Sequence, residues 1–115
     1  MPYTKPLFTF VELPPFSKVR ELYLSDDEFG ELQRFITEQP DAGDVIPGSG
    51  GCRKLRWSAP GRGKRGGVRV IYFLRLANGQ VVLVMLYAKN VTANIDAGVL
   101  KAIRKRHDDE QETKR

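Results

Sequence analysis

The chain has 115 residues, of which 41% are hydrophobic and 29% charged, and its formal net charge is +5 at pH 7. This length predicts one domain, because typical domains span roughly 100 to 150 residues, and the composition is ordinary for a soluble globular protein. A single cysteine, Cys52, and a single histidine, His107, exclude an intramolecular disulfide and a metal site built from several such ligands.

The N-terminal segment MPYTKPLFTFVEL lacks the basic start and the long apolar run of a signal peptide. No stretch of the sequence approaches the ~20 apolar residues that a membrane helix needs. We therefore expect a cytoplasmic protein that makes no membrane contact and uses no metal or cofactor.

The first third of the chain predicts one strand and two helices. Residues Leu7–Leu13 are rich in aromatic and β-branched side chains and end at two prolines, as strands often do. Apolar residues at helical spacing follow over Phe16–Leu24. Ser25, with Glu28 three residues later, predicts a capping box for a second helix that stops before Pro40. We expect the two helices to pack as a hairpin on one side of a sheet.

The next segment predicts a loop followed by a strand with two different faces. Residues Pro40–Gly51 contain four glycines and two prolines and are expected to form the loop. In the strand Cys52–Ser58, alternation places Lys54 and Arg56 on one face and Arg53 on the other. One face of this strand is therefore polar and carries two cations.

The second half of the chain predicts two more strands and a last helix. After a loop over Ala59–Gly67, the run Val68–Leu76 has the pattern of a strand. The Asn78-Gly79 dipeptide predicts a tight turn into Val81–Tyr87, the most apolar run, which we expect to be a central strand buried on both faces. Helical spacing over Asn94–Arg106 predicts the third helix.

The resulting order is strand, helix, helix, strand, strand, strand, helix. It predicts an α+β fold with a small, largely antiparallel sheet. We expect a single domain over residues 1–107 and a charged, frayed tail over residues 108–115. His107 lies in the charged segment RKRHDDEQETKR and is expected to be solvated.

Positive charge is concentrated in the middle of the sequence. Between Val45 and Ile95 there is no Asp or Glu, whereas nine basic residues occur. They are Arg53, Lys54, Arg56, Arg62, Lys64, Arg65, Arg69, Arg75 and Lys89. Such a block attracts polyanions, and nucleic acid is the partner with a regular row of negative charges. The alternative is a solvated basic face with no binding role.

Glycines 61, 63 and 66 match G-x-G-x-x-G, the pattern of dinucleotide-binding loops. A strand rather than a helix is expected to follow, and no Walker motif occurs, so this pattern does not predict a nucleotide cofactor. The loop instead places three cations between two basic strands, an arrangement suited to gripping phosphates.

The same residues are compatible with RNA cleavage by the RNA's own 2′-hydroxyl. That reaction needs a base for the hydroxyl, cations for the charge that develops at phosphorus, and an acid for the leaving oxygen. The basic block contains neither a histidine nor a carboxylate. A lysine crowded by other cations is a substitute, because like charge disfavours its protonated form; Lys54, flanked by Arg53 and Arg56, is the candidate. Nucleic-acid binding without cleavage stays open.

Three motifs together resemble a known toxin family. They are GDVIPGSGGCRKLRW from Gly43, GRGKRGGVRVIYF from Gly61, and LYAKN from Leu86. The pattern is similar to the HigB branch of the RelE/ParE toxin superfamily. The resemblance implies a RelE-like fold and a metal-independent endoribonuclease, or mRNA interferase, that cuts mRNA in the ribosomal A site. It also implies a helix-turn-helix antitoxin, with operator DNA contacted only through the toxin–antitoxin complex.

The resemblance also implies roles for individual residues. Lys54, Arg56 and Arg69 match catalytic positions, and Arg69 matches an arginine that contacts the scissile phosphate. RNA or phosphate binding is expected of Arg53, Arg62, Lys64, Arg65, Tyr72, Tyr87 and Lys89. RelE-type toxins stack a tyrosine after the last strand on the substrate base; no aromatic residue occurs there, so Tyr72 and Tyr87 are the candidates in its place.

Two alternative functions stay open at the level of sequence. One is a catalytically weakened relative that only binds nucleic acid and antitoxin, which the missing stacking tyrosine would explain. The other is gyrase inhibition as in the ParE branch, because a shared fold does not fix function.

Overall fold

The computed structural model describes residues 8–58, 67–91 and 95–113, which form an α+β fold. A five-stranded sheet has the order β1-β5-β4-β3-β2. Its strands are β1 (Thr9–Glu12), β2 (Asp44–Val45), β3 (Arg53–Trp57), β4 (Val68–Arg75) and β5 (Gln80–Ala88). β1 runs parallel to β5, and the other neighbouring strands are antiparallel. The predicted fold class is confirmed.

Two details of the sheet differ from the prediction. β4, rather than the apolar run 81–87, is the middle strand, because β1 pairs with β5 and a further strand, β2, pairs with β3. β2 itself lies in the predicted loop 40–51. The apolar run is nevertheless buried on both faces, since residues 81–84 are fully shielded from solvent.

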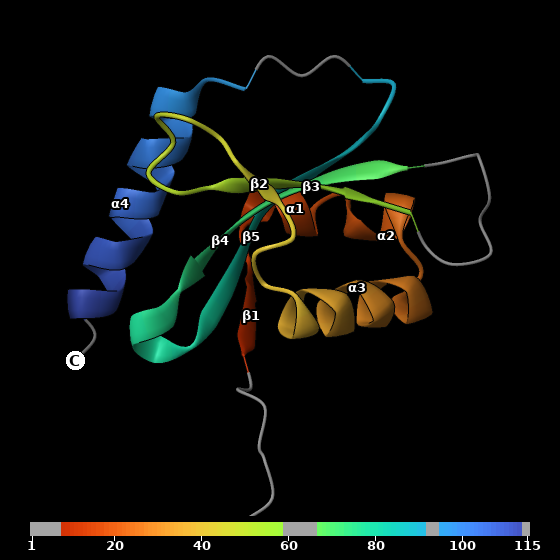
Figure 1. The fold of residues 1–115 in the computed structure, drawn as a ribbon, viewed down its shortest axis with the longest axis horizontal. Helices are drawn as coiled ribbons and strands as arrows, with labels where there is room; N and C mark the ends of the chain where they lie inside the picture. Colours follow the sequence, from red (N-terminus) through yellow and green to blue (C-terminus); the bar gives the residue numbers. More distant parts are fainter. Residues whose placement is uncertain (1–7, 59–66, 92–94, 114–115) are drawn as a thin grey trace, which may run out of the picture.

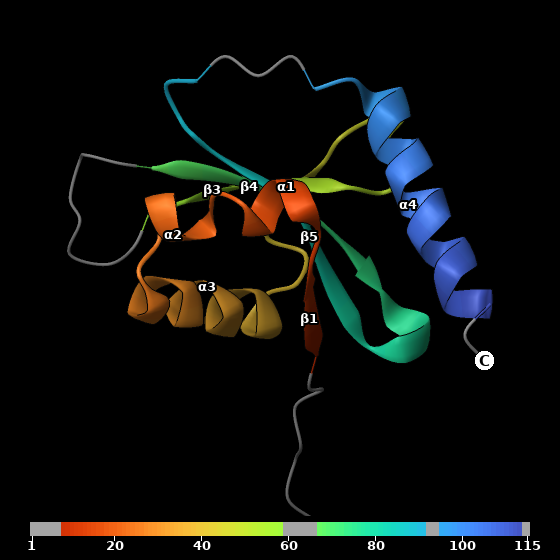
Figure 2. The ribbon, with the colours of Figure 1, turned by 180° about the vertical axis from the view of Figure 1, so that it is seen from behind.

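Three helices cover one face of the sheet, where two had been predicted. The first expected helix is two short ones, α1 (Pro14–Ser17) and α2 (Arg20–Tyr23), separated at Val19, where φ widens to −116°. α3 (Asp26–Glu38) starts at the predicted capping box: the Glu28 N–H donates to Ser25 Oγ at 3.1 Å, and the Ser25 N–H donates to Glu28 Oε1 at 2.8 Å. Figure 2 shows these helices gathered on one side of the sheet.

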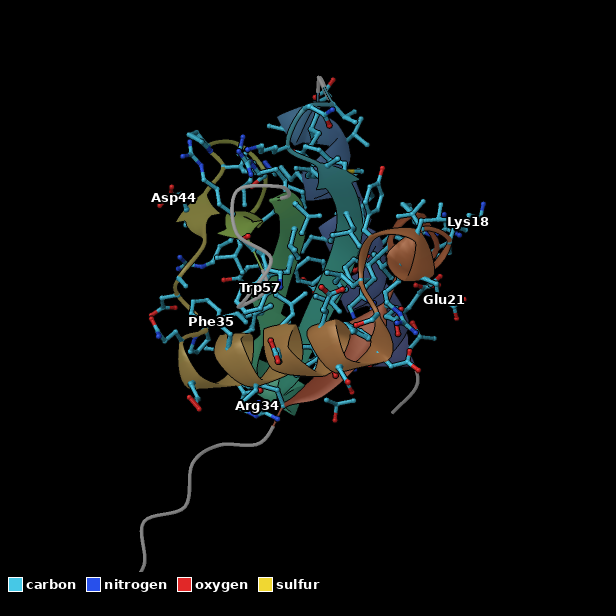
Figure 3. The ribbon with its side chains drawn as sticks, turned by 90° about the vertical axis from the view of Figure 1, so that its right-hand side faces the viewer. Lys18, Glu21, Arg34, Phe35, Asp44 and Trp57 are labelled. Atoms are coloured by element: carbon cyan, nitrogen blue, oxygen red, sulfur yellow. The ribbon has the colours of Figure 1, made fainter. Side chains whose placement is uncertain are left out.

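We call the side under these helices the hairpin face; Leu55, Val70 and Tyr72 point into it. Its core also holds Phe16, Leu32 and Ile36 from the helices. At its edge the rings of Trp57 and Phe35 lie against each other, with centroids 5.2 Å apart (Figure 3). Amphipathic packing of α3 thus fixes the orientation of β3.

The opposite side, which we call the α4 face, is covered by α4 (Ala97–Thr113). Cys52, Ile71 and Phe73 pack there against Leu100. Figure 1 shows α4 beside the sheet, well separated from α3. No helix in the described ranges is long and apolar enough to cross a membrane.

The C-terminal tail was predicted wrongly for residues 108–113, which continue α4 instead of fraying. Arg75 holds this end of the helix through Asp108 at 3.0 Å and Glu112 at 3.3 Å. His107 is also not solvated: it is 6% exposed, and its Nε2 lies 2.8 Å from Gln80 Oε1. These partners lie some thirty residues away in sequence, so local charge composition did not reveal them.

Candidate active site

A row of polar side chains crosses the α4 face over three strands. Arg56 pairs with Arg69, and Arg69 pairs with Tyr87. Directly paired residues of antiparallel strands share a face, with Cβ atoms about 4.5–5.5 Å apart. Lys54 lies two residues before Arg56 and therefore points to the same side. The predicted alternation of β3 is confirmed.

Lys89 extends this row at the end of β5. Its N–H donates to the Gly67 carbonyl at 3.1 Å. A Cβ built on Gly67 would lie 3.5 Å from Arg69 Nη1 and 3.7 Å from Lys89 Cδ, so both cationic side chains approach the bare glycine. We call Lys54, Arg56, Arg69, Tyr87 and Lys89 the cationic patch.

A β-bulge determines which residues at the end of β5 join the patch. The register between β4 and β5 shifts at residues 71 and 72, so that Val84 is an extra residue in β5. Val84 and Met85 consequently both contact the core under α4. Normal alternation after Met85 then directs Tyr87 and Lys89 to the α4 face.

The cationic patch lies where α4 no longer covers the sheet. Lys54, Arg56 and Lys89 are exposed, and Arg69 and Tyr87 are half-buried. In Figure 1, α4 flanks the side of the β4–β5 turn, whereas β3 ends and β4 begins at the opposite side. A ligand can therefore approach the patch directly on the sheet.

The charges of the patch are not neutralised by acids of the described chain. Within residues 8–58, 67–91 and 95–113, no carboxylate oxygen lies within 4.0 Å of a nitrogen of its two lysines and two arginines. Ion pairs instead occupy other cations, namely Arg20, Arg53, Arg75, Arg104 and Lys105. The patch thus keeps its positive potential for a partner from outside.

Tyr87 adds a hydroxyl group to this potential. Burial raises the pKa of Tyr87, and the positive charge of Arg69 acts in the opposite direction. Because the ordinary tyrosine pKa is about 10, the hydroxyl is neutral at physiological pH. It can donate a hydrogen bond to a phosphate or sugar oxygen, or its ring can contact a base.

Tyr72 does not belong to the patch, contrary to the prediction. It is fully buried in the hairpin face, where its hydroxyl donates to the Pro40 carbonyl at 2.7 Å and accepts from the Gly43 N–H at 3.1 Å. Its distance of three residues from Arg69 along one strand already requires opposite faces. Tyr72 therefore anchors the segment 40–43 and cannot contact RNA.

Arg53 has the same anchoring role and also differs from its predicted one. It lies on the hairpin side of β3, and its Nη1 donates to the Gly43 carbonyl at 2.7 Å and to the Asp41 carbonyl at 3.2 Å. Its Nη2 lies 3.5 Å from an Asp41 carboxylate oxygen. Arg53 is thus engaged within the chain and does not crowd Lys54 from the same face.

Asp44 is a neighbour of the cationic patch that the sequence analysis missed. It pairs directly with Lys54 between β2 and β3 and so shares the α4 face with the patch. Figure 3 shows Asp44 on β2, at the edge of the sheet. The acid-free block starts one residue later, at Val45, and only the formation of β2 folds this carboxylate back beside the cations.

Comparison with known families agrees with this fold. The model of the RelE toxin, from the RelE/RelB toxin–antitoxin system, matches residues 20–114. The match includes the whole patch and most of the chain. The chain belongs to the RelE toxin family. It is therefore the toxin of a toxin–antitoxin pair, with an antitoxin as partner, and the superfamily part of the predicted resemblance is confirmed.

Other predicted features of this RelE-family toxin lie off the patch or outside the described chain. Arg62, Lys64 and Arg65 fall in residues 59–66, which the structure does not describe. Burial raises the pKa of the Cys52 thiol, against smaller effects of Arg104 and Ser49, so Cys52 is no nucleophile. Among the residues with described positions, no three His, Cys, Asp or Glu side chains gather into a metal site.

Proposed function

We propose that this RelE-family toxin is a ribosome-dependent mRNA endonuclease that cleaves by attack of a 2′-hydroxyl on the adjacent phosphate, without a metal. The observation that carries the proposal is the direct pairing of Arg56 with Arg69, flanked by Lys54 and Lys89, with no ion pair from these cations to an acid of the described residues. Adjacent guanidinium groups match the oxygens of a phosphate by bidentate hydrogen bonds. Two of them can hold one scissile phosphate from both sides.

Arg56 and Arg69 would act most strongly on the transition state. The attacked phosphorus gains negative charge as the 2′-oxygen adds, and preformed donors aimed at that charge lower the barrier. Lys54 would take part in proton transfer, because it lies next to this pair on the same face. Tyr87 would contact the substrate base or sugar from the other end of the row.

Lys89 would position the flanking RNA. The cations Arg62, Lys64 and Arg65 would add contacts to phosphates of mRNA or ribosomal RNA, because their loop connects the two strands that carry Arg56 and Arg69. We propose a cytoplasmic site of action, since the ribosome is the substrate carrier. We also propose a HigB-type assignment, with a helix-turn-helix antitoxin through which the toxin reaches operator DNA.

Mapping of mRNA 5′ ends after induction in cells tests this function. Wild-type toxin should produce codon-positioned cuts and arrest growth, and Arg69→Ala should reduce cleavage at least about 100-fold, as loss of a transition-state donor does. Arg34→Ala is the matched control, because Arg34 is an exposed arginine on α3, away from the patch (Figure 3). Unchanged growth without new 5′ ends would contradict the proposal.

A second candidate, binding of RNA and antitoxin without cleavage, is favoured by one observation. Tyr72 is buried, so Tyr87 alone among the two predicted stacking residues lies on the patch. In that case purified toxin would bind ribosomes in a salt-dependent way, and no cut would appear in the bound mRNA. Inhibition of gyrase in a supercoiling assay would instead indicate ParE-like activity.

A further inference from the structure

Asp44 is held at the edge of the cationic patch by contacts on the opposite side of the sheet. The residue before it, Gly43, is buried and is bonded at both its N–H and its carbonyl. Tyr72 accepts the first bond and Arg53 donates the second, at 3.1 Å and 2.7 Å. A Cβ at Gly43 would meet the Tyr72 ring at 3.0 Å, so the chain passes through a tight contact just before Asp44.

From this anchor Asp44 points to the α4 face between two cations. Lys54 lies directly opposite, where Cβ atoms are about 4.5–5.5 Å apart, and Arg56 is its diagonal neighbour, at roughly 7–8 Å. The lengths of the side chains bridge these separations. A phosphate held by Arg56 and Arg69 would therefore have a carboxylate on one flank.

The Asp44 carboxylate is available for chemistry. Its side chain is exposed, and no hydrogen bond or ion pair to it is formed within the described residues. Asp41, three residues earlier, is the comparison: its carboxylate faces the other side of the sheet and pairs with Arg53. The pairing of β2 with β3 thus places the side chain of Asp44, and not that of Asp41, beside the patch.

We propose that Asp44 is the general base of the RNA cleavage, an inference that rests on the proposed function. The 2′-O–H bond breaks and its proton passes to a carboxylate oxygen of Asp44. The freed electron pair forms the new bond from the 2′-oxygen to phosphorus, giving a 2′,3′-cyclic phosphate. The bond from phosphorus to the 5′-oxygen breaks, and this oxygen takes a proton from the ammonium of Lys54.

The arrangement favours this division of roles over a lysine base. The direct pairing of Asp44 with Lys54 places a carboxylate and an ammonium group side by side on one face, so one can accept a proton and the other can donate one. Arg53, the cation whose crowding would favour a neutral lysine, is turned to the hairpin side and paired with Asp41. One acidic and one basic side chain, paired across two strands, then supply both proton transfers.

The test measures single-turnover cleavage of a defined mRNA on programmed ribosomes by wild type, Asp44→Asn and Asp44→Glu under identical conditions. Asn is isosteric and cannot accept the proton, so its rate should fall about 10²- to 10⁴-fold, the usual contribution of a general base. Asp44→Glu should recover part of the rate, and no variant should bind ribosomes more weakly than wild type does.

Asp41→Asn is the matched control, since it removes a neighbouring carboxylate from the other face and should leave the cleavage rate unchanged. Cleavage by Asp44→Asn at the wild-type rate would overturn the assignment of Asp44 alone. Failure of wild type to cut any mRNA would instead overturn the proposed function, and this inference with it. Ribosome binding no weaker than that of wild type shows that each variant is folded.

Discussion

Arg56 and Arg69 are directly paired across β3 and β4, so two groups of like charge project side by side from one face of the sheet. Like charges at such positions destabilise a sheet by a few tenths to about 1 kcal/mol. Neither arginine forms an ion pair with an acid of the described residues, so the repulsion is not compensated within this part of the chain. A bound phosphate would relieve it. The arrangement therefore favours ligand binding at the expense of stability.

Arg56→Gln should consequently stabilise the free toxin while it disables the patch. Removing one charge of the pair should raise the free energy of unfolding by about 0.2–1 kcal/mol. Urea denaturation of the purified toxin measures this change. A loss of stability instead would mean that Arg56 makes a favourable contact that outweighs its repulsion from Arg69.

Lys89→Ala should weaken the binding of single-stranded RNA and reduce its dependence on salt. Each phosphate contact with single-stranded nucleic acid contributes a slope of about −0.7 in log K against log salt concentration. Loss of Lys89 should make the slope less steep by about that amount. Lys18→Ala is the control: Lys18 is exposed beside α1 (Figure 3), and its loss should leave the slope unchanged.

Tyr72→Phe should destabilise the fold and slow cleavage without loss of RNA affinity. The change leaves the Gly43 N–H and the Pro40 carbonyl without their partner, and an unpaired buried group costs about 1–3 kcal/mol. The Asp44 segment would lose its anchor. Urea denaturation and single-turnover cleavage measure the two effects. Tyr23→Phe is the control, since the Tyr23 hydroxyl has no hydrogen bond within the described ranges and its loss should change neither.

Stability should also fall in alkaline solution through Tyr72. Burial raises the pKa of Tyr72 in the folded state, against smaller opposing effects of Gly43 and Arg53. Above the ordinary tyrosine pKa of about 10, the unfolded chain loses this proton while the folded chain retains it. The free energy of unfolding must then decrease as pH rises. Unfolding curves at pH 8 to 11 should show a weaker decline in Tyr72→Phe than in wild type.

Arg75→Ala should loosen the last turns of α4. Arg75 connects β4 to Asp108 and Glu112, and its side chain is only 12% exposed. Amide hydrogen exchange should accelerate in residues 107–113 and stay the same in α3. Lys105→Ala is the control, because the Lys105–Asp109 pair is solvent-exposed and such pairs contribute little, about 0–1 kcal/mol. Equal protection in both variants would contradict a specific role for Arg75.

The sequence predicted correctly those features that depend on residues close together in the chain. The capping box of α3 depends on Ser25 and Glu28, which are neighbours in sequence, and it occurs where predicted. The alternation of β3 separated Lys54 and Arg56 from Arg53 before any pairing was known. Both features follow from backbone geometry alone.

Features that depend on partners distant in sequence escaped prediction. His107 is buried because Gln80 and Phe73 face it across the α4 packing, which no pattern around residue 107 reveals. Asp44 joins the patch because two residues of a glycine-rich loop pair with β3. The acid-free block defined from the sequence begins at Val45, so Asp44 lay one residue outside the predicted site.

The extra residue at Val84 makes the end of β5 sensitive to its length. Without it, alternation would turn Tyr87 and Lys89 under the helical hairpin and bring apolar side chains out beside Arg69. A one-residue deletion between the β4–β5 turn and Tyr87 would thus exchange the two sides of the strand, whereas a point substitution would alter one side chain. The site therefore depends more strictly on the number of residues in this strand than on the identity of any one of them.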